Sequence, residues 1–371
     1  MRVIIIGGGI LGTTHALEAV QRGHHVVHLE REAEARGATV RNFGLVWVSG
    51  RTAAELDAAL RARDLWQRLG AVVPGVGFRP AGSLTVLRTP GEVAVAEEAI
   101  GRIDADRRGF TLLDADEAGR LNPALRGKFI AALHCSTDAV VESRQALPAI
   151  REHLAASGRY TFLAGTEGRA VEGRTVRDDR GRRHDGDLVI VCAGAAHGGL
   201  VRELAGELPV RRVRLQMMQT APLGEALTTA IADGDSMRYY PGFAGAALDE
   251  LHGAQSQDPT AEAHHMQLLC VQRLHGGLTI GDTHEYAEPF AFDVSEDPYD
   301  YLAGVVEEVL GRALPPVVRR WAGVYSQSVD PGELVCRRTP ADGVVVVTGP
   351  GGRGMTLAPA VAERTAELAG L

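Results

Sequence analysis

The sequence is very poor in lysine. Lys128 is the only lysine, so arginine supplies 38 of the 39 basic side chains. Schiff-base formation or proton abstraction by lysine therefore has a single candidate residue. A guanidinium is suited instead to bidentate capture of a carboxylate or a phosphonate. We expect any small acid bound by this protein to be held by arginine.

Paired cysteines are missing as well. The four cysteines, Cys135, Cys192, Cys270 and Cys336, lie far apart and form no C-x-x-C pair. This spacing predicts reduced thiols in the core, and neither a disulfide framework nor a zinc site. No zinc-ligand set or Ser-His-Asp pattern is recognised either, so neither a metal site nor a nucleophilic site is predicted.

The sequence has no long apolar run and no leader segment. No stretch of about 18 apolar residues is present, which argues against a membrane span. Met1 leads directly into the apolar run Arg2–Ile6, which leaves no room for a signal peptide. We expect a cytoplasmic protein without membrane contact. A net charge of −8 argues against a nucleic-acid partner.

The first 22 residues contain a glycine motif between a strand and a helix. The apolar run Arg2–Ile6 is typical of a strand buried on both faces of a parallel sheet. Gly7, Gly9 and Gly12 follow in the order G-x-G-x-x-G, which allows a tight turn, close approach of the backbone to a ligand, and close helix packing. Helix Ile10–Arg22 would aim its N-terminal N–H groups at a pyrophosphate.

An acidic residue completes this unit. His25–Leu29 is predicted as the next strand, and Glu30 lies at its tip. A carboxylate there accepts hydrogen bonds from a ribose hydroxyl and disfavours a 2′-phosphate. The motif therefore predicts a bound dinucleotide other than NADP, and by itself does not separate FAD from NAD.

Small and polar residues follow the acid. A charged loop, Arg31–Arg36, leads to Thr39, Arg41, Asn42 and Gly44. Such a segment suits a chain that passes along an elongated cofactor. We expect it to contact cofactor or substrate.

Two later segments resemble the opening motif in character. A buried strand ends in Ala193-Gly194, which indicates a second passage of backbone beside a dinucleotide. Near the C-terminus, strand Gly343–Thr348 is followed by the glycine-rich turn Gly349–Met355 and helix Thr356–Leu368. The cofactor domain is therefore predicted to be discontinuous and completed by the C-terminus.

The length of 371 residues favours two domains. The predicted fold class is α/β plus α+β. The first domain is a discontinuous Rossmann-like cofactor domain, and the second is built on a mainly antiparallel sheet. Alternating segments predict the strands of that sheet, namely Arg214–Thr220, Met237–Tyr240, Met266–Leu274 and Leu278–His284. The predicted cofactor domain comprises residues 1–77, 143–211 and 323–371, and the substrate domain residues 78–142 and 212–322.

Apolar spacing predicts the remaining elements. The helices are Ala53–Leu69, Pro90–Asp106, Asp114–Leu121, Ser143–Ala156 with Ser143 as N-cap, and Tyr299–Leu310. The strands are Phe78–Leu87, Phe129–His134, Val171–Val176 and Arg183–Val191.

Several segments together resemble a known family. They are IIIGGGILG, Glu30, Arg41–Gly44, DLVIVCAGA and GPGGRGMTLAPA. In these the chain resembles FAD-dependent oxidoreductases of the D-amino-acid oxidase type, which include glycine and sarcosine oxidases. The segment ATVRNFGLVW also resembles a subgroup found in bacterial aminophosphonate breakdown.

The resemblance implies FAD as the cofactor. Some sarcosine oxidases attach FAD through a cysteine, but the matching stretch Trp321–Ser326 contains none, so non-covalent FAD is expected. The residues expected to bind FAD are Gly7, Gly9, Ile10, Gly12, Glu30, Arg31, Thr39, Arg41, Asn42, Gly44, Ala193, Gly194, Gly351, Gly352, Arg353, Gly354, Met355 and Thr356.

The same relatives use a lysine near the flavin to promote reaction with oxygen. Lys128 is far from the flavin motifs in sequence, so either another group such as Arg353 or His284 takes over this role or the reaction with oxygen is weak. The acceptor is therefore oxygen or another electron acceptor, with an oxidase favoured over a dehydrogenase.

The expected chemistry is loss of a hydride from the carbon next to nitrogen to flavin N5, which requires a neutral amine and an anchored acidic tail. Arg238 and Tyr240, placed on one face of a predicted strand, are the first candidates for substrate binding. Arg353, Tyr325 and Arg41 are the others. Tyr240 and His284 are the only candidates for a catalytic role.

Three functions are consistent with these features. The first is FAD-dependent oxidation of a small amine with an anionic tail, by deamination or N-dealkylation, with an aminophosphonate related to 2-aminoethylphosphonate as substrate. The second is oxidation of small amino acids such as glycine, sarcosine or D-amino acids. The third is a non-catalytic FAD-binding redox or structural partner.

Overall fold

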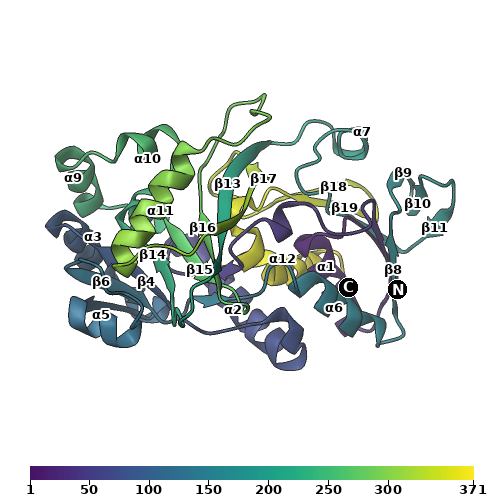
Figure 1. The fold of residues 1–371 in the computed structure, drawn as a ribbon. Helices are drawn as coiled ribbons and strands as arrows, with labels where there is room; N and C mark the ends of the chain where they lie inside the picture. The colour runs from purple at the N-terminus through teal and green to yellow at the C-terminus, as the bar shows by residue number, and fades with distance from the viewer.

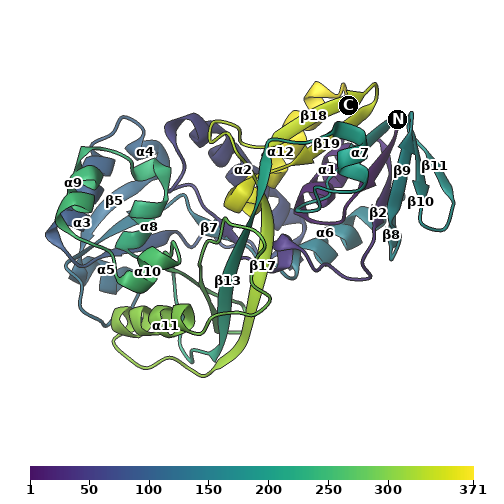
Figure 2. The same ribbon diagram turned by 90° about the horizontal axis from the view of Figure 1, so that it is seen from above.

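A computed structural model describes residues 1–371, whose two largest sheets lie side by side (Figures 1 and 2). The first sheet has the order β18-β19-β12-β1-β2-β8 and is parallel except for its edge strand β18. Its strands are β1 (Arg2–Ile6), β2 (His25–Glu30), β8 (Tyr160–Ala164), β12 (Leu188–Val191), β18 (Cys336–Ala341) and β19 (Val344–Thr348).

Both faces of the first sheet are covered, which explains the unbroken apolar runs of its strands. Val3 and Ile5 of β1 point into a core shared with four helices, whereas Ile4 and Ile6 point to the opposite face. The helices are α1 (Ile10–Gln21), α2 (Ala53–Val72), α6 (Ala146–Ala155) and α12 (Gly354–Leu368). The opposite face carries α7 (Leu200–Ala205) and a meander of β9 (Gly168–Glu172), β10 (Thr175–Asp178) and β11 (Arg183–Asp185).

The second sheet has the order β17-β13-β16-β15-β14-β4-β6-β5, and only its β14–β4 pair is parallel. Its strands are β4 (Ser83–Leu87), β5 (Phe110–Asp114), β6 (Ala131–Cys135), β13 (Val210–Pro222), β14 (Ala230–Ala232), β15 (Leu269–Gln272), β16 (Gly277–Gly281) and β17 (Val317–Ser328). Helix α11 (Asp297–Leu310) packs its apolar stripe on one face, through residues such as Leu302, Val306 and Val309. The other face, with Leu215 and Met217 of β13, belongs to a separate core beside the cavity described below.

Shorter elements complete the chain. They are α3 (Pro90–Ile100), α4 (Ala105–Arg108), α5 (Ala115–Leu121), α8 (Gly234–Tyr239), α9 (Ala246–Ala254), α10 (Pro259–Ala263), a two-stranded ladder of β3 (Leu45–Val46) with β7 (Ala139–Val140), and 3-10 turns at Ala38–Val40, Pro74–Val76, Pro241–Phe243 and Gly351–Arg353. No helix of the structure is both long and apolar enough to span a bilayer.

The long pair β13–β17 connects the two halves (Figure 2). Its antiparallel register runs from Val210 opposite Ser328 to Thr220 opposite Val317. At its far end the Ser328 N–H donates to the Gly349 carbonyl at 2.9 Å, in the turn that follows β19. The second sheet is thereby fixed to the C-terminal glycine turn of the first.

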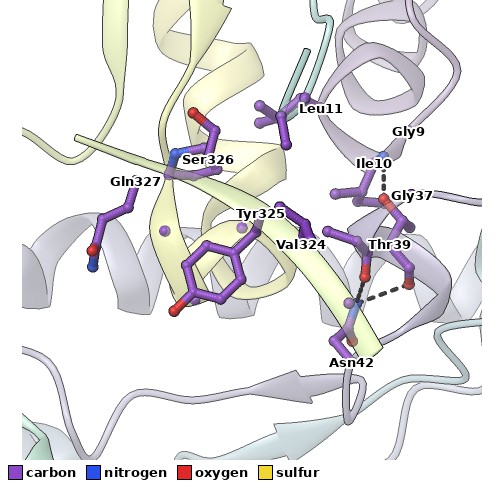
Figure 3. A pocket seen from close by; sticks show the side chains of 18 of the residues that line it. Gly9, Ile10, Leu11, Gly37, Thr39, Asn42, Val324, Tyr325, Ser326 and Gln327 are labelled. Carbon is purple, nitrogen blue, oxygen red and sulfur yellow. Dashed lines mark hydrogen bonds between the residues drawn. The ribbon is translucent and has the colours of Figure 1, made fainter. Parts of the chain in front are cut away.

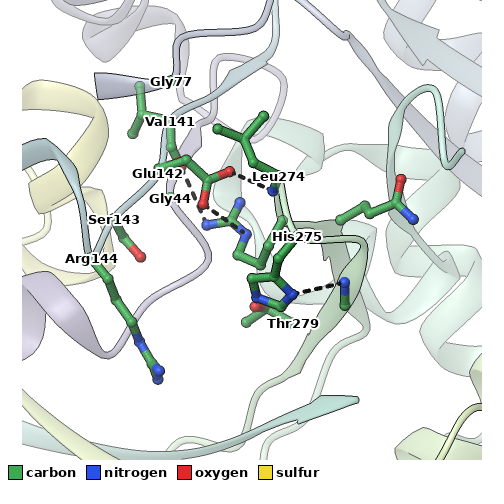
Figure 4. A network of polar contacts seen from close by, with 12 residues as sticks. Gly44, Gly77, Val141, Glu142, Ser143, Arg144, Leu274, His275 and Thr279 are labelled. Carbon is green, nitrogen blue, oxygen red and sulfur yellow. Dashed lines mark hydrogen bonds and ion pairs between the residues drawn. The ribbon is translucent and has the colours of Figure 1, made fainter. Parts of the chain in front are cut away.

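A buried ionic network joins the halves at another place (Figure 4). The Glu142 carboxylate, 4% exposed, accepts from Arg79 Nη1 at 2.8 Å and from the Leu274 N–H at 3.1 Å. Arg273 Nε lies 3.9 Å from the same carboxylate. One carboxylate therefore compensates two arginines between the β15–β16 hairpin and the segment that leads into α6.

Most predicted elements occur in the structure, with shifted ends. Five predictions were wrong in detail. The single helix Pro90–Asp106 is broken into α3 and α4, and Gln145 rather than Ser143 is the residue before α6. The segments Val171–Val176 and Arg183–Val191 each contain parts of two strands. Met237–Tyr240 is not a strand, as discussed below. The domain boundaries stay a prediction, since β13 and β17 run across two of them.

Candidate functional site

A cavity of about 1170 Å³ lies between the two sheets. The β1–α1 turn, the tip of β2 and the C-terminal glycine turn line one side, and β13, β17 and the Tyr239–Pro241 segment line the other. Figure 3 shows Gly9, Ile10 and Leu11 facing Val324–Gln327 of β17 across this space. A cavity of this volume is large for a small metabolite alone.

The β1–α1 turn requires glycine at two positions. Gly7 has φ +105°, and a Cβ there would lie 2.2 Å from the Cys192 carbonyl oxygen. A Cβ on Gly12 would lie 1.9 Å from the Gly7 carbonyl oxygen. Gly12 therefore brings helix α1 onto the turn, and unlike Gly7 and Gly9 it does not line the cavity.

A neutral histidine supports the same turn. His28 Nε2 donates to the Gly7 carbonyl at 2.9 Å, so its Nδ1 accepts from the Tyr160 hydroxyl at 2.9 Å. Burial lowers the pKa of His28 to about 3. The residue thus holds the glycine turn without adding charge beside the ligand.

The acid at the tip of β2, Glu30, lines the cavity. Glu30 accepts from the Gly8 N–H at 2.6 Å through Oε2 and from the Glu32 N–H at 2.9 Å through Oε1. These bonds fix the carboxylate at the end of the cavity next to the glycine turn. That is the position from which it would bind a ribose.

The loop after Arg31 is shaped by its own side chains. The Asn42 amide donates to the carbonyls of Ala38 at 2.9 Å and Thr39 at 2.8 Å, and accepts from the Gly44 N–H at 2.7 Å (Figure 3). Thr39 Oγ1 accepts from the Ile10 N–H at 2.9 Å. Gly44 lies outside the cavity lining. A Cβ on it would lie 2.0 Å from the Val141 carbonyl oxygen, so its role is packing.

Backbone without side chains borders much of the cavity. At Gly194, Gly198 and Gly199 a Cβ would meet no protein atom within 4 Å, and at Gly352 only the Tyr325 hydroxyl at 3.9 Å. The N-termini of α1 and α12 also reach the lining. Open glycine faces and helix N-termini are the features that accept an elongated dinucleotide with its phosphates.

Arg238 is not in the site. The segment that contains it is helix α8, because the Asp233 side chain accepts from the Ser236 N–H and starts a helix there. Strand alternation therefore does not apply. Arg238 donates to the Gln255 carbonyl at 2.8 Å and lies 3.5 Å from Asp235, away from the cavity. Its expected role as first candidate for the substrate anchor was wrong.

Arg353 and Arg41 line the cavity, but both already have partners. Arg353 forms an ion pair with Glu55 and donates to the carbonyls of Glu333 and Pro350. Arg41 donates to the Ala322 carbonyl at 2.7 Å. Both arginines are engaged in holding the chain around the cavity.

Arg51, which the sequence did not single out, has no such partner. It lines the cavity, is 5% exposed, and none of its guanidinium nitrogens makes a hydrogen bond or an ion pair. Its Cζ lies 5.4 Å from the centroid of the Tyr240 ring. Burial lowers the pKa of Arg51, and the negative charge of Glu55 opposes this shift. The result is a buried cation that faces the cavity without a hydrogen bond or ion pair, with Glu55 as its nearby negative charge.

Aromatic rings surround this end of the cavity. Tyr239 stacks on His284 at 4.2 Å between centroids and meets Tyr240 edge-on at 5.1 Å. Trp47 Nε1 and the Tyr325 hydroxyl are buried without a hydrogen-bond partner. The aromatic side chains at this end are Phe43, Trp47, Tyr239, Tyr240, His284, Tyr286 and Tyr325.

An acidic residue lies among these rings. Asp282 is 5% exposed and lines the cavity. Its Oδ1 accepts from Gln267 Nε2 at a long 3.4 Å, and its Oδ2 is 3.7 Å from His284 Nε2. Burial raises the pKa of the Asp282 carboxyl, and the adjacent His284 opposes this. In the sequence, Asp282 and His284 both lie in the segment GDTH at the end of a predicted strand, but only His284 is among the predicted candidates.

The structure therefore brings most predicted residues together. Of those expected to bind substrate or take part in catalysis, Tyr240, Arg353, Tyr325, Arg41 and His284 line the cavity. No group of three or more His, Cys, Asp or Glu side chains is arranged to hold a metal ion. The residues expected to bind the cofactor that line the cavity are Gly7, Gly9, Ile10, Glu30, Arg31, Thr39, Arg41, Asn42, Ala193, Gly194, Gly351, Gly352, Arg353, Gly354, Met355 and Thr356.

Comparison with known proteins gives a consistent result. A family model described as FAD dependent oxidoreductase matches residues 2–368. A putative thiamine biosynthesis oxidoreductase of Rhizobium etli is 30% identical over 214 residues, 56% of this chain and only 58% of that protein. A D-amino-acid oxidase of Streptomyces coelicolor is 28% identical over 275 residues, 70% of this chain and 74% of that protein. The structure of glycine oxidase from Geobacillus kaustophilus has a TM-score of 0.79 at 19% identity and covers 100% of this chain and 95% of its own.

Proposed function

The chain belongs to the family of FAD-dependent oxidoreductases that includes D-amino-acid oxidase, and we propose that it oxidises a small amine with an anionic tail. The proposed substrate is an aminophosphonate related to 2-aminoethylphosphonate. The reaction is oxidative deamination or N-dealkylation, by hydride loss from the carbon next to nitrogen. The alternative substrate is a small amino acid such as glycine, sarcosine or a D-amino acid.

The residues present fit FAD. The open glycine faces at Gly194 and Gly352, the fixed Glu30 carboxylate and the two helix N-termini form one continuous cradle. When bound, FAD accepts the hydride and supplies the redox chemistry. The four cysteines are unpaired and buried, and only Cys192 lines the cavity, so non-covalent binding remains the proposal.

The unpartnered Arg51 is the observation that carries the proposal. A buried cation with no counter-ion is unfavourable in the ligand-free protein, and such groups persist where a ligand compensates them. Arg51 is the one buried arginine of the cavity whose guanidinium is free. A bidentate pair with an anionic tail would satisfy it.

Additional unused donors support a phosphonate in particular. Trp47 Nε1 and the Tyr325 hydroxyl have no partners, and Trp47 and Arg51 both lie against Tyr240. A carboxylate presents two oxygens and a phosphonate three. The number of free donors therefore favours the larger anion.

The remaining lining of this end suits a small, partly apolar substrate. Met217 and Leu269 contribute buried side chains between the rings. Such a wall excludes water from the reacting carbon and strengthens the charge interactions inside. It leaves little that would hold a second charged tail.

The test is a substrate panel with the flavin-loaded enzyme. Peroxide formation is measured with 2-aminoethylphosphonate, its N-methyl derivative, glycine, sarcosine and D-alanine, and the series is repeated with an artificial acceptor. We expect the highest kcat/KM with an aminophosphonate and peroxide as product. Turnover of the carboxylates alone would overturn the aminophosphonate, and turnover with the artificial acceptor alone would overturn the oxidase.

A further inference from the structure

The proton balance of the proposed reaction raises a requirement that the cavity meets. A substrate with an aliphatic amine enters as an ammonium at neutral pH, because such amines have pKa values near 10. Hydride loss needs the neutral amine. Some group in the cavity must therefore take a proton from nitrogen.

Asp282 is the one acid in the cavity available for this. Glu30 is held by two backbone N–H groups, and Glu55 is paired with Arg353. Glu32 and Glu167 belong with Glu30 to the glycine-turn end of the lining, remote from Arg51. Asp282 has only the long bond from Gln267.

The tautomer of His284 follows from its other partner. His284 Nδ1 lies 2.9 Å from the His265 carbonyl oxygen, which can only accept, so Nδ1 carries a hydrogen. In the neutral ring Nε2 then carries a lone pair and no hydrogen, and it lies 3.7 Å from Asp282 Oδ2. Two acceptors that face each other hold one proton between them more easily than none.

We propose that Asp282 and His284 act as a dyad that binds the substrate ammonium and removes its proton before oxidation. This inference rests on the proposed function and deepens it. One N–H bond of the ammonium breaks, and its proton joins the dyad on Asp282 Oδ2 or His284 Nε2. No electrons leave or enter in this step. The neutral amine then lies between the dyad and the Arg51 end, with its carbon free to lose hydride.

The other groups that face the dyad carry no charge of their own. From the α8 end, Tyr239 and Tyr240 approach Asp282, and from β17 Tyr325 does so. Burial raises the pKa of all three hydroxyls, so they stay protonated. Gln267, from the segment before β15, and Tyr286, whose ring lies 6.4 Å from that of His284, complete the surroundings. At this end of the cavity the dyad therefore supplies the lone pairs that can accept the proton of the ammonium.

The experiment is the pH dependence of kcat/KM in flavin-loaded wild type and in Asp282→Asn. For wild type we expect a rise with pH as the dyad loses its proton, followed by a plateau. For D282N we expect a loss of about 10²- to 10³-fold at pH 7.5. The loss should shrink to less than about 10-fold near pH 10, where about half of the amine arrives neutral. A deficit that is equal at all pH values, or no deficit, would overturn the proposal.

A binding measurement and a control variant distinguish a role of Asp282 in proton transfer from a purely structural role. Binding of n-propylphosphonate, which has a methyl in place of the nitrogen, is followed by the flavin absorbance change, and D282N should bind it at least as tightly as wild type. Weaker binding would indicate a damaged site and overturn the specific role. Asp233→Asn is the matched control, because Asp233 is a buried acid that caps α8 outside the cavity, and its pH profile should equal that of wild type.

His284→Asn tests the pairing. An asparagine amide can still donate to the His265 carbonyl, but it has no lone pair that takes up a proton. The rising limb of the profile should move, and an unmoved limb would overturn the role of His284. A wild-type enzyme that oxidises no amine of the panel would overturn the proposed function and this inference with it. An active wild type with an unaffected D282N would overturn this inference alone.

Discussion

Replacing Arg51 by methionine should make the enzyme more stable and much less active. Methionine fills a similar volume against Tyr240 without a charge. Because Arg51 forms no hydrogen bond or ion pair in the ligand-free protein, and Glu55 retains its pair with Arg353, the substitution removes a buried cation without breaking a direct contact. Replacing buried ion pairs by apolar residues of similar volume has been neutral or has stabilised proteins by about 1–4 kcal/mol, and removal of a cation that has no direct partner should act in the same direction. We expect a higher Tm without ligand.

The loss of activity follows from the same geometry. Removing one partner of a buried, hydrogen-bonded charge pair costs about 2–5 kcal/mol. At about 1.36 kcal/mol per factor of ten, this corresponds to a fall in kcat/KM of about 30- to 5,000-fold. Arg51→Lys keeps a point charge but loses the planar fork, so its loss should be intermediate.

The assay combines thermal unfolding with steady-state kinetics on the best substrate and on n-propylamine, which has no anionic tail. R51M should leave the low kcat/KM for n-propylamine unchanged within about threefold. Arg353→Met is the contrasting variant, because it strands the Glu55 carboxylate and should lower Tm. A lower Tm for R51M, or equal losses on both amines, would refute the role of Arg51 as an anion anchor.

Three other predictions concern the scaffold. Glu142→Gln should lower the free energy of unfolding by about 3–5 kcal/mol, because two arginines lose their only carboxylate; denaturant titration measures this, and Glu225→Gln on the exposed surface should cost less than about 1 kcal/mol. Gly12→Ala should abolish flavin binding, since its Cβ would overlap the Gly7 carbonyl oxygen; flavin absorbance per protein reports it, and Gly253→Ala, with nothing within 4 Å, is the neutral control. His28 has a pKa near 3 in the folded protein against 6.5 when unfolded, so the unfolded state binds the proton first as pH falls. Stability should therefore decrease from about pH 6.5 towards pH 3, by up to about 1.4 kcal/mol per pH unit for this residue. A His28→Gln variant, although less stable at pH 8, should show a flatter dependence, and an equal slope would contradict this account.

The cofactor side of the site was predictable because its signals are local. The turn that requires Gly7, the helix that follows it and the acid at the tip of β2 all lie within 30 residues. Backbone sterics and strand alternation are written into such short segments. The C-terminal turn could be found in the same way, as strand, glycines and helix in succession.

The substrate side was predicted less well because its residues come from distant segments. Arg238 was placed by strand alternation, but the Asp233 cap makes the segment a helix and directs that side chain elsewhere. Arg353 lies in the expected turn, yet its ion pair with Glu55 depends on a residue from helix α2. Asp282 stands two residues from His284, and only its burial among the rings makes its carboxylate notable.

The sequence by itself determined the dinucleotide motif, the presence of two kinds of sheet and the bias towards arginine, because periodicity and glycine placement act over a few residues. Tertiary structure alone decided which arginine is free. Arg41 and Arg353 are engaged by groups far away in the chain, whereas Arg51 is buried with none. Whether a charged side chain has a partner depends on residues that only the folded chain brings near it. The contrast between the paired Arg41 and Arg353 and the unpaired Arg51 is what supports the proposed anion site.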